Sequence, residues 1–290
     1  MKNDFTWKFD LRLLIESIQM KDGKLLLIDM SHYIYRAYYG ISVEKFQTKN
    51  GMPTNAIYGV CNMILKTIEE LNDDDNIHVI CCFDSKTCNA TRKQEDDNYK
   101  KNRKKMPEAL HNQFPLIYEM IDCMELTRVT VENHEADDII SSLSKKFIDK
   151  FEKIYICSPD KDCCQCVNET VNIFNPKKNE ILNQQGVYEK YKIMPKDFTK
   201  YQALVGDTCD NIHGITSIGP KTAVKVIESC DGNLEVCTHS KMELIRQHWE
   251  QYVKNLKLVT LDDSLFINIE NTCQFQIQCR STTSSTGLLG

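Results

Sequence analysis

The sequence lacks an apolar run long enough to cross a bilayer. Its longest runs, such as residues 24–28, are far shorter than the roughly 20 residues that a membrane-spanning helix needs. The N-terminal region contains Asp4, Asp10 and Glu16 and no uninterrupted apolar stretch, which argues against a secretory signal. We therefore expect a cytoplasmic protein without membrane contact.

An excess of positive charge is also missing. The formal net charge is -5, which argues against nonspecific nucleic-acid binding through overall charge but leaves local basic patches open. The chain has 290 residues, of which 41% are hydrophobic and 27% are charged. This size and composition suit one large domain, or a domain with a smaller lobe, around a sizeable core.

The cysteines lack the pattern of a zinc site, although there are 14 of them. Cys163, Cys164 and Cys166 form a cluster, but no second cluster with matching histidines follows at zinc-site spacing. Cys81 and Cys82 lie inside an apolar run. We therefore expect reduced, buried cysteines that act as small apolar residues, with metal ligation as the alternative.

Short apolar strands alternate with helical periodicity through the first part of the chain. Predicted strands cover 24–29, 78–84, 127–131, 154–158 and 171–174, and predicted helices cover 5–20, 54–71, 107–124 and 135–149. This alternation predicts an α/β fold with a mostly parallel central sheet. After about residue 186 the pattern becomes helical.

Acidic residues recur at the C-terminal ends of the predicted strands or just beyond, where open α/β sheets bind ligands. With a further acidic pair, the set comprises Asp29, Asp84, Glu135, Asp137, Asp138, Asp160, Asp162, Asp207 and Asp210. The last two would share one helical face if their segment is helical. Taken singly, each acid has a simpler explanation, as a first-turn residue favoured by the helix dipole or as a turn residue.

Carboxylates that converge on one cleft repel one another unless they are protonated or neutralised by cations. An all-oxygen ligand set favours Mg²⁺ or Mn²⁺ over zinc. His134 and Glu135 are followed by Asp138 instead of a second histidine, so the zinc protease motif is absent. Two such ions suit phosphodiester hydrolysis, because one activates water and both stabilise the charged transition state.

Residues 86–105 carry a stripe of positive charge in this acidic chain. The stripe contains Arg92, Lys93, Lys100, Lys101, Arg103, Lys104 and Lys105, with Tyr99 among them. Because it follows the Asp84 strand, we expect it to grip phosphates, and Tyr99 could stack on a base. A solvated helix face is the simpler alternative.

Residues 214–227 form a second candidate anion site. Gly214 and Gly219 punctuate the segment, and Pro220 suits the first position of a helix. Exposed amides at that helix N-terminus could hold a phosphate, with Lys221 adding charge. A two-glycine turn is also common as a plain link between helices.

Several segments together resemble the 5′ nuclease family, which includes the N-terminal domain of bacterial DNA polymerase I and the phage flap endonucleases. The segments run in order from about residue 24 to 230. They are LLLIDMSHYIYRAYYG, NGMPTNAIYGVCNMILK, YKKNRKKMPEAL, NHEADDII, SPDKD and ALVGDTCDNIHGITSIGPKTA.

The resemblance implies a domain organisation. It suggests a PIN-like α/β nuclease core at residues 23–185, with a helical arch at about 86–125. A helical DNA-binding region would cover 186–270 and contain a helix-hairpin-helix at about 203–230. Residues 1–22 would form a helical extension, and residues 281–290, rich in Ser and Thr, a disordered tail.

The resemblance also implies roles for individual residues. All nine carboxylates would bind Mg²⁺, with Mn²⁺ as a substitute, and the helix-hairpin-helix would bind K⁺. Lys100, Arg103 and Arg36 would contact the scissile phosphate. The expected DNA contacts are Tyr99, Arg92, Lys93, Lys104, Gly214, Gly219, Lys221 and Thr222.

The implied activity is that of a free-standing, monomeric, structure-specific 5′ nuclease. It would be both a 5′-3′ exonuclease and a flap endonuclease, acting in primer or flap removal during replication and repair. Its substrates would be 5′ flaps, 5′ ends, branched junctions and RNA primer–DNA hybrids. One alternative is a catalytically silent branched-DNA-binding homologue, which should have lost carboxylates. Another is a PIN-type ribonuclease, which should lack the arch and the helix-hairpin-helix.

The chain departs from the family pattern at three places. Met30 replaces the usual glycine, Ser158-Pro159 replaces Thr-Gly before Asp160, and His213 replaces a proline. None of these changes removes a carboxylate, so we expect an active enzyme.

Overall fold

The computed structural model describes residues 22–71, 76–268 and 274–275. The predicted N-terminal helix at 5–20 and the predicted tail at 281–290 lie outside these residues. Within the described ranges, no helix combines the length and apolar character needed to cross a membrane.

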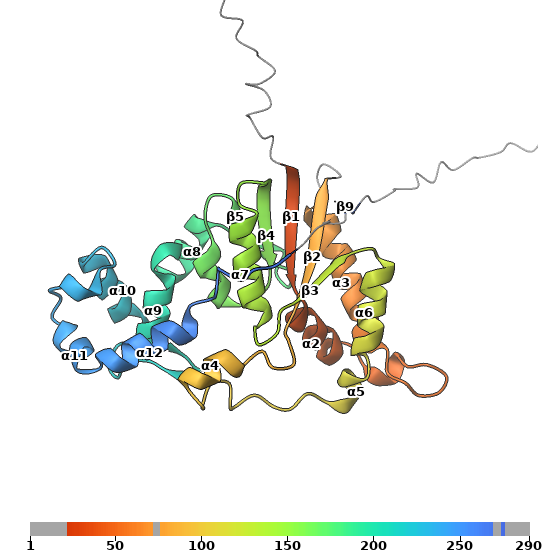
Figure 1. The fold of residues 1–290 in the computed structure, drawn as a ribbon, viewed down its shortest axis with the longest axis horizontal. Coiled ribbons are helices and arrows are strands. Elements are labelled where there is room, and N and C mark those ends of the chain that lie inside the picture. The colour runs from red at the N-terminus through yellow and green to blue at the C-terminus, as the bar shows by residue number, and fades with distance from the viewer. Residues whose placement is uncertain (1–21, 72–75, 269–273, 276–290) are drawn as a thin grey trace, which may run out of the picture.

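A central, mostly parallel sheet organises the first part of the chain (Figure 1). Its parallel strands are β1 (Asp22–Asp29), β2 (Ile77–Phe83), β3 (Thr127–Thr130), β4 (Phe151–Cys157) and β5 (Val171–Asn175). Along the sheet the order is β3-β2-β1-β4-β5-β6. The antiparallel additions are β6 (Glu180–Leu182) beside β5 and β9 (Gln274–Phe275) beside β2. All five predicted strands are confirmed.

Helices cover both faces of this sheet. One face carries α2 (Met30–Gly40), α3 (Asn55–Leu71) and α6 (Phe114–Cys123), and the other carries α7 (Ala136–Lys146). Alternate residues of β1 serve the two cores: Leu25 packs in the cluster that contains Ile139, and Leu26 in the cluster that contains Ile64. A strand buried on both faces needs an unbroken apolar run, which explains the sequence of residues 24–28.

The chain becomes helical after the sheet, as the sequence predicts. The helices are α8 (Gln184–Tyr191), α9 (Phe198–Val205), α10 (Pro220–Ser229), α11 (Met242–Gln247) and α12 (Trp249–Val259). A two-stranded hairpin of β7 (Gly206–Asp207) and β8 (Ile212–His213) lies between α9 and α10. Short 3₁₀ helices cover Val43–Lys45, Lys161–Cys166, Pro195–Asp197 and Leu234–Val236.

Two helix predictions need correction. The helix predicted at 107–124 is divided into α5 (Glu108–His111) and α6, because Pro115 in the first turn of α6 lacks the N–H that a continuous helix would need. The basic segment contains only the short α4 (Ala90–Glu95), and no helix follows before α5. Asp96 ends α4 by accepting from Asn98 N at 2.9 Å, and Lys100 has a positive φ of 53°. Figure 1 shows the chain running from α4 to α5 as a long irregular connection.

Candidate metal centre

The strand-end carboxylates meet at one edge of the sheet. Asp29 ends β1 and caps α2 by accepting from His32 N at 3.1 Å. Asp84 follows β2 and accepts from Ser31 Oγ at 2.6 Å and from Ala136 N at 2.8 Å. Asp84 thereby ties the end of one strand to the start of α7.

Ser158, one of the departures from the family pattern, lies inside this arrangement. Its buried hydroxyl donates to Asp29 Oδ2 at 2.9 Å and accepts from Asp160 N at 3.1 Å. A serine therefore bridges the acidic ends of β1 and β4. Met30, another departure, is fully buried in the core beneath α2.

The three acids at the start of α7 have different environments. Glu135 and Asp138 form a capping box, in which Glu135 N donates to Asp138 Oδ2 at 3.3 Å. Asp137 Oδ1 is buried and has no hydrogen-bond partner. Burial, followed by the charges of Asp160 and Asp29, raises the pKa of Asp137 well above its ordinary value. Such an orphaned carboxylate oxygen requires a proton or a cation.

A second acidic group lies beside the first. Asp162, Asp207 and Asp210 offer carboxylate oxygens that all lie within 4.8 Å of one another. The last two are not on a helix face, as the spacing suggested: Asp207 is in β7, Asp210 is in the following turn, and Asn211 has a positive φ of 60°. The hairpin therefore brings them together, with Cys209 N donating to Asp207 Oδ1 at 2.9 Å.

The raised pKa values of these acids favour the binding of a cation. Burial and then Asp84 raise the pKa of Asp29 to about 7. Burial also raises the pKa of Asp160 and that of Asp162, to which the neighbouring carboxylates contribute. An all-oxygen set with unsatisfied negative charge fits a hard divalent cation such as Mg²⁺ or Mn²⁺.

The second half of the basic segment folds onto the same acids. Lys100 Nζ lies 2.6 Å from Glu135 Oε1 and 3.5 Å from Asp210 Oδ2, and Arg103 Nη2 lies 2.8 Å from Asp210 Oδ1. The Tyr99 hydroxyl donates to Glu135 Oε2 at 3.0 Å and to Asp210 Oδ2 at 3.2 Å. Tyr99 is only 2% exposed, so in this structure its ring is not open for a base to stack on.

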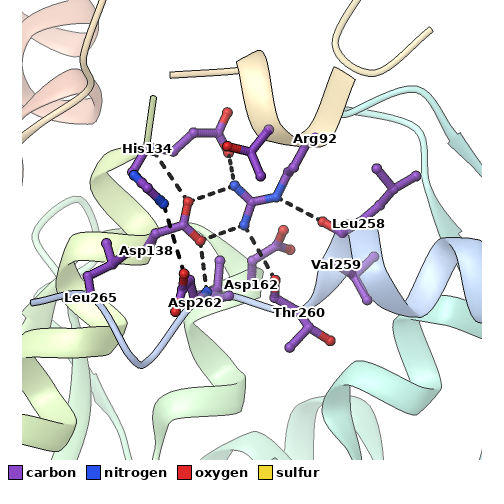
Figure 2. A network of polar contacts seen from close by, with 12 residues as sticks. Arg92, His134, Asp138, Asp162, Leu258, Val259, Thr260, Asp262 and Leu265 are labelled. Carbon is purple, nitrogen blue, oxygen red and sulfur yellow. Dashed lines mark hydrogen bonds and ion pairs between the residues drawn. The ribbon is translucent and has the colours of Figure 1, made fainter. Parts of the chain in front are cut away.

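Arg92 differs most from its predicted role as a DNA contact. Its buried guanidinium donates to both oxygens of Asp138, to Glu135 Oε2 and to the carbonyls of Leu258 and Thr260 (Figure 2). An arginine has five N–H donors, and all five are used here. Arg92 therefore has no donor left for a phosphate in this structure, and its contact with DNA stays a prediction.

The remaining predicted residues lie apart from the carboxylates. Lys93 and Lys104 are exposed, and Arg36 on α2 has a buried Nη1 without a hydrogen-bond partner. Lys221 and Thr222 are in the first turn of α10, which Gly219 precedes.

Gly214 lies where two backbone segments pack closely. A Cβ atom there would lie 2.2 Å from the carbonyl oxygen of Val205, so glycine allows two backbone segments to approach closely.

Besides Ser31, which donates to Asp84, two residues that contact the acids are not predicted from the sequence. Lys161 Nζ lies 3.1 Å from Asp207 Oδ2, and Gln202 Nε2 donates to Asp162 Oδ1. Lys161 stands between Asp160 and Asp162 in the sequence, which was a signal for it. Gln202 had no such signal.

The prediction of buried cysteines is confirmed for part of the set and is wrong for Cys123 and Cys209, which are exposed. Cys81, Cys82, Cys163 and Cys164 are buried among apolar side chains, and Cys166 is partly buried. Burial raises the pKa of the Cys163 thiol well above its ordinary value. Among these residues, the acidic group of Asp162, Asp207 and Asp210 has metal-binding geometry, and no group containing cysteine does.

The chain thus has a buried acidic centre at the C-terminal edge of a parallel sheet, where open α/β sheets bind ligands, and a helical region joined to it. Residues 24–192 match the family model for the 5′-3′ exonuclease N-terminal resolvase-like domain, and residues 193–281 match that for the 5′-3′ exonuclease C-terminal SAM fold. The chain belongs to the 5′-3′ exonuclease family, whose members are hydrolases acting on DNA phosphodiester bonds.

Curated relatives agree with this assignment. The 5′-3′ exonuclease of Aquifex aeolicus is 32% identical over 239 residues, which cover 82% of this chain and 78% of that protein. The 5′-3′ exonuclease of Buchnera aphidicola subsp. Acyrthosiphon pisum is 38% identical over 208 residues, or 72% and 71% of the two chains. The thermostable DNA polymerase I of Thermus aquaticus is 33% identical over 239 residues, which are 81% of this chain and 28% of the polymerase.

Solved structures confirm the fold. The T5 D15 protein co-crystallised with metal ions has a TM-score of 0.67 at 19% identity and covers 82% of this chain and 90% of that one. The T5 D15 flap endonuclease in a pseudo-enzyme–product complex with DNA and metal ions has a TM-score of 0.63 at 18% identity, with coverage of 82% and 89%.

Proposed function

We propose that this chain is a structure-specific 5′ nuclease that cuts 5′ flaps and removes nucleotides from 5′ ends at duplex junctions, with a role in primer or flap removal. The observation that carries the proposal is the convergence of carboxylates from β1, β2, β4, α7 and the β7–β8 hairpin, several of them without a cationic partner. Structural relatives with metal ions bound support it.

The acids support two divalent cation sites. Asp29, Asp84, Asp137 and Asp160 suit one ion, with Asp137 Oδ1 as its unsatisfied ligand atom. The other ion is suited by the group of Asp162, Asp207 and Asp210. Glu135 lies between the two groups, because Lys100 and Tyr99 contact both Glu135 and Asp210. When bound, two Mg²⁺ ions would activate water and neutralise the charge that develops on the phosphate.

The cations of the basic segment suit a role at the scissile phosphate. Lys100 and Arg103 reach the edge of the acidic centre, where they now pair with Glu135 and Asp210. A phosphate would take over these donors and add charge-assisted hydrogen bonds of the kind that stabilise a transition state. Arg36 has a buried Nη1 without a hydrogen-bond partner, which would reach a neighbouring phosphate after a movement of the side chain.

The helical region suits the DNA duplex. Gly219 is exposed with open space around it. Pro220 has no N–H, and the amides of Thr222 and Ala223 donate to the Gly219 carbonyl, so the amide and side chain of Lys221 are the first-turn donors that suit a phosphate. K⁺ at this turn, the range of junction and RNA–DNA substrates, a monomeric state and a cytoplasmic location remain predictions.

The test is a cleavage assay on three substrates with Mg²⁺: a 5′-flap DNA duplex, the same DNA single-stranded, and an RNA hairpin. We expect the flap to be cut at the junction and no cleavage after chelation of the metal. Binding of the flap without cleavage would favour the silent homologue. Preference for the RNA hairpin would favour a PIN-type ribonuclease.

A further inference from the structure

Two adjacent residues of the basic segment differ in burial. Arg92 in α4 is 8% exposed, whereas its neighbour Lys93 is exposed to solvent. The Arg92 Nη1 and Nη2 atoms lie 2.7 and 2.6 Å from the two oxygens of Asp138, which is 2% exposed. This is a buried, two-pronged arginine–carboxylate pair of the strong type.

Asp138 has little coordination capacity left for a metal. Besides the two bonds from Arg92, its Oδ1 accepts from Asp262 N at 2.9 Å and its Oδ2 from Glu135 N at 3.3 Å (Figure 2). Four donors thus occupy its two oxygens, in contrast with the unpartnered Oδ1 of Asp137 next to it. The two adjacent aspartates therefore have different chemical environments.

The pair joins three distant parts of the chain. Arg92 comes from α4, Asp138 from α7, and the carbonyls of Leu258 and Thr260, which Arg92 Nε and Nη2 reach at 3.0 and 3.4 Å, from the end of α12 and the residue after it. Each contact fixes the direction of α4. Residues 96–103, which carry Tyr99, Lys100 and Arg103 to the acidic centre, start where α4 ends.

Arg92 also contacts one proposed metal ligand directly. Its Nη1 donates to Glu135 Oε2 at 3.0 Å, the same oxygen that accepts from Tyr99, while Lys100 holds Oε1. The Arg92 guanidinium thus helps to hold the Glu135 carboxylate in place.

We propose that Arg92 is a positioning residue of this nuclease and that Asp138 is its dedicated counter-ion instead of a metal ligand. The pair fixes the base of the basic segment and the carboxylate of Glu135, so that Lys100 and Arg103 reach the acidic centre in register. The proposal rests on the proposed function for its kinetic consequence, but not for its statement about metal binding.

The central experiment is a charge-neutral replacement, Arg92→Met with Asp138→Leu in the full-length chain. Replacing both partners removes the buried ion pair as a unit, and Glu135 keeps Lys100 and Tyr99 as partners, so this variant should fold. Circular dichroism and thermal melting check that it does. Because the net charge is unchanged, its metal affinity reports on ligand number.

Mn²⁺ binding measured by calorimetry without DNA gives the first result. The loss of a ligand should exceed the roughly 10–100-fold loss of affinity typical of outer contacts. We therefore expect the double variant to lose no more than about 10-fold, and Asp162→Asn to lose more than about 100-fold. Equal losses in the two proteins would overturn the assignment of Asp138 as a counter-ion.

Flap cleavage gives the second result. We expect Arg92→Lys to lower kcat about 10–100-fold with little change in KM, because lysine keeps the charge but lacks the planar group that binds both oxygens of Asp138. Asp138→Asn should lower kcat by a similar factor, and the double variant Arg92→Lys with Asp138→Asn by no more than either, because each acts through the other. Multiplying effects would contradict the proposal.

A matched control exists on the opposite side of the sheet. Arg128 binds both oxygens of Asp122 at 2.6 and 2.9 Å, but both side chains are largely exposed. Arg128→Lys should leave kcat and Mn²⁺ affinity unchanged. If the parent protein binds Mn²⁺ but cuts no flap, the proposed function fails, while the calorimetric comparison still tests the role of Asp138.

Discussion

Two groups of carboxylates stand side by side in this molecule, and their partners differ. Glu135, Asp138, Asp207 and Asp210 each accept a lysine or arginine from the chain itself. Asp29, Asp137, Asp160 and Asp162 have raised pKa values from burial and mutual repulsion. The second group carries negative charge that no basic side chain among the described residues offsets with an ion pair. In the first group a basic partner does not exclude a metal, because Asp207 and Asp210 lie with Asp162 in the second proposed cation site.

The largest expected effect comes from the uncompensated group. Asp137→Asn keeps the shape of the side chain but removes an anionic ligand, so we expect flap cleavage to fall at least about 10³-fold, since a metal site contributes several kcal/mol to the transition state. The control is Asp149→Asn, an exposed aspartate just beyond the other end of α7. Steady-state cleavage with saturating Mg²⁺ measures both. An active Asp137→Asn protein would show that the orphaned oxygen has no role.

Lys100 tests the boundary between the two groups. Removal of its cation by Lys100→Ala should lower kcat about 10²–10³-fold, as for other transition-state donors. The same variant should bind Mn²⁺ more tightly without DNA, because Glu135 Oε1 loses a competitor that lies 2.6 Å away. Calorimetry and flap cleavage on one preparation separate these opposite effects. Weaker Mn²⁺ binding would contradict the view that Lys100 acts as an internal counter-ion.

The metal-free protein should become less stable as the pH rises. Burial raises the pKa of Asp29 to about 7 in the folded state, against an ordinary value of 3.8, so the folded state holds a proton that the unfolded state has released. Folding stability is therefore lost as the pH rises from 5.5 to 7.5, by roughly 2 kcal/mol for this group. Urea unfolding in the presence of a chelator measures it.

Divalent metal and a single substitution provide the controls for this trend. Saturating Mg²⁺ should flatten it, because the cation replaces the proton, and Asp29→Asn should reduce it. A chelated parent protein that grows more stable toward pH 7.5 would contradict the raised pKa.

The smallest expected effect concerns Ser158. Ser158→Ala removes the hydrogen bond to Asp29 Oδ2 and the acceptor for Asp160 N, which should lower the free energy of unfolding by about 1–2 kcal/mol. Ser158→Thr, which keeps the hydroxyl, should restore most of it. Equal stability of the alanine variant and the parent would mean that the bridge is dispensable.

The strand-end acids were predictable because parallel strands carry their C-terminal ends to one edge, and this rule places Asp29 and Asp84 together. Asp207 and Asp210 do converge, but through a hairpin and not a helix face, since spacing alone does not distinguish the two. Arg92 could not be separated from Lys93 or Lys104 by composition. Its burial depends on carbonyls 166 and 168 residues away, which no local pattern encodes.

The contacts between Arg92 and the end of α12 also set an order of events during synthesis. The strands of the sheet that come from residues 22–182 have all left the ribosome long before Leu258 and Thr260 are made. Because domains fold from the N-terminus as they emerge, the sheet can form while Arg92 still lacks two of its acceptors. The base of the basic segment is therefore fixed late in synthesis. A nascent chain that stops before Leu258 would contain the acids of the centre but lack the contacts that hold Arg92, and with it Lys100 and Arg103, in position.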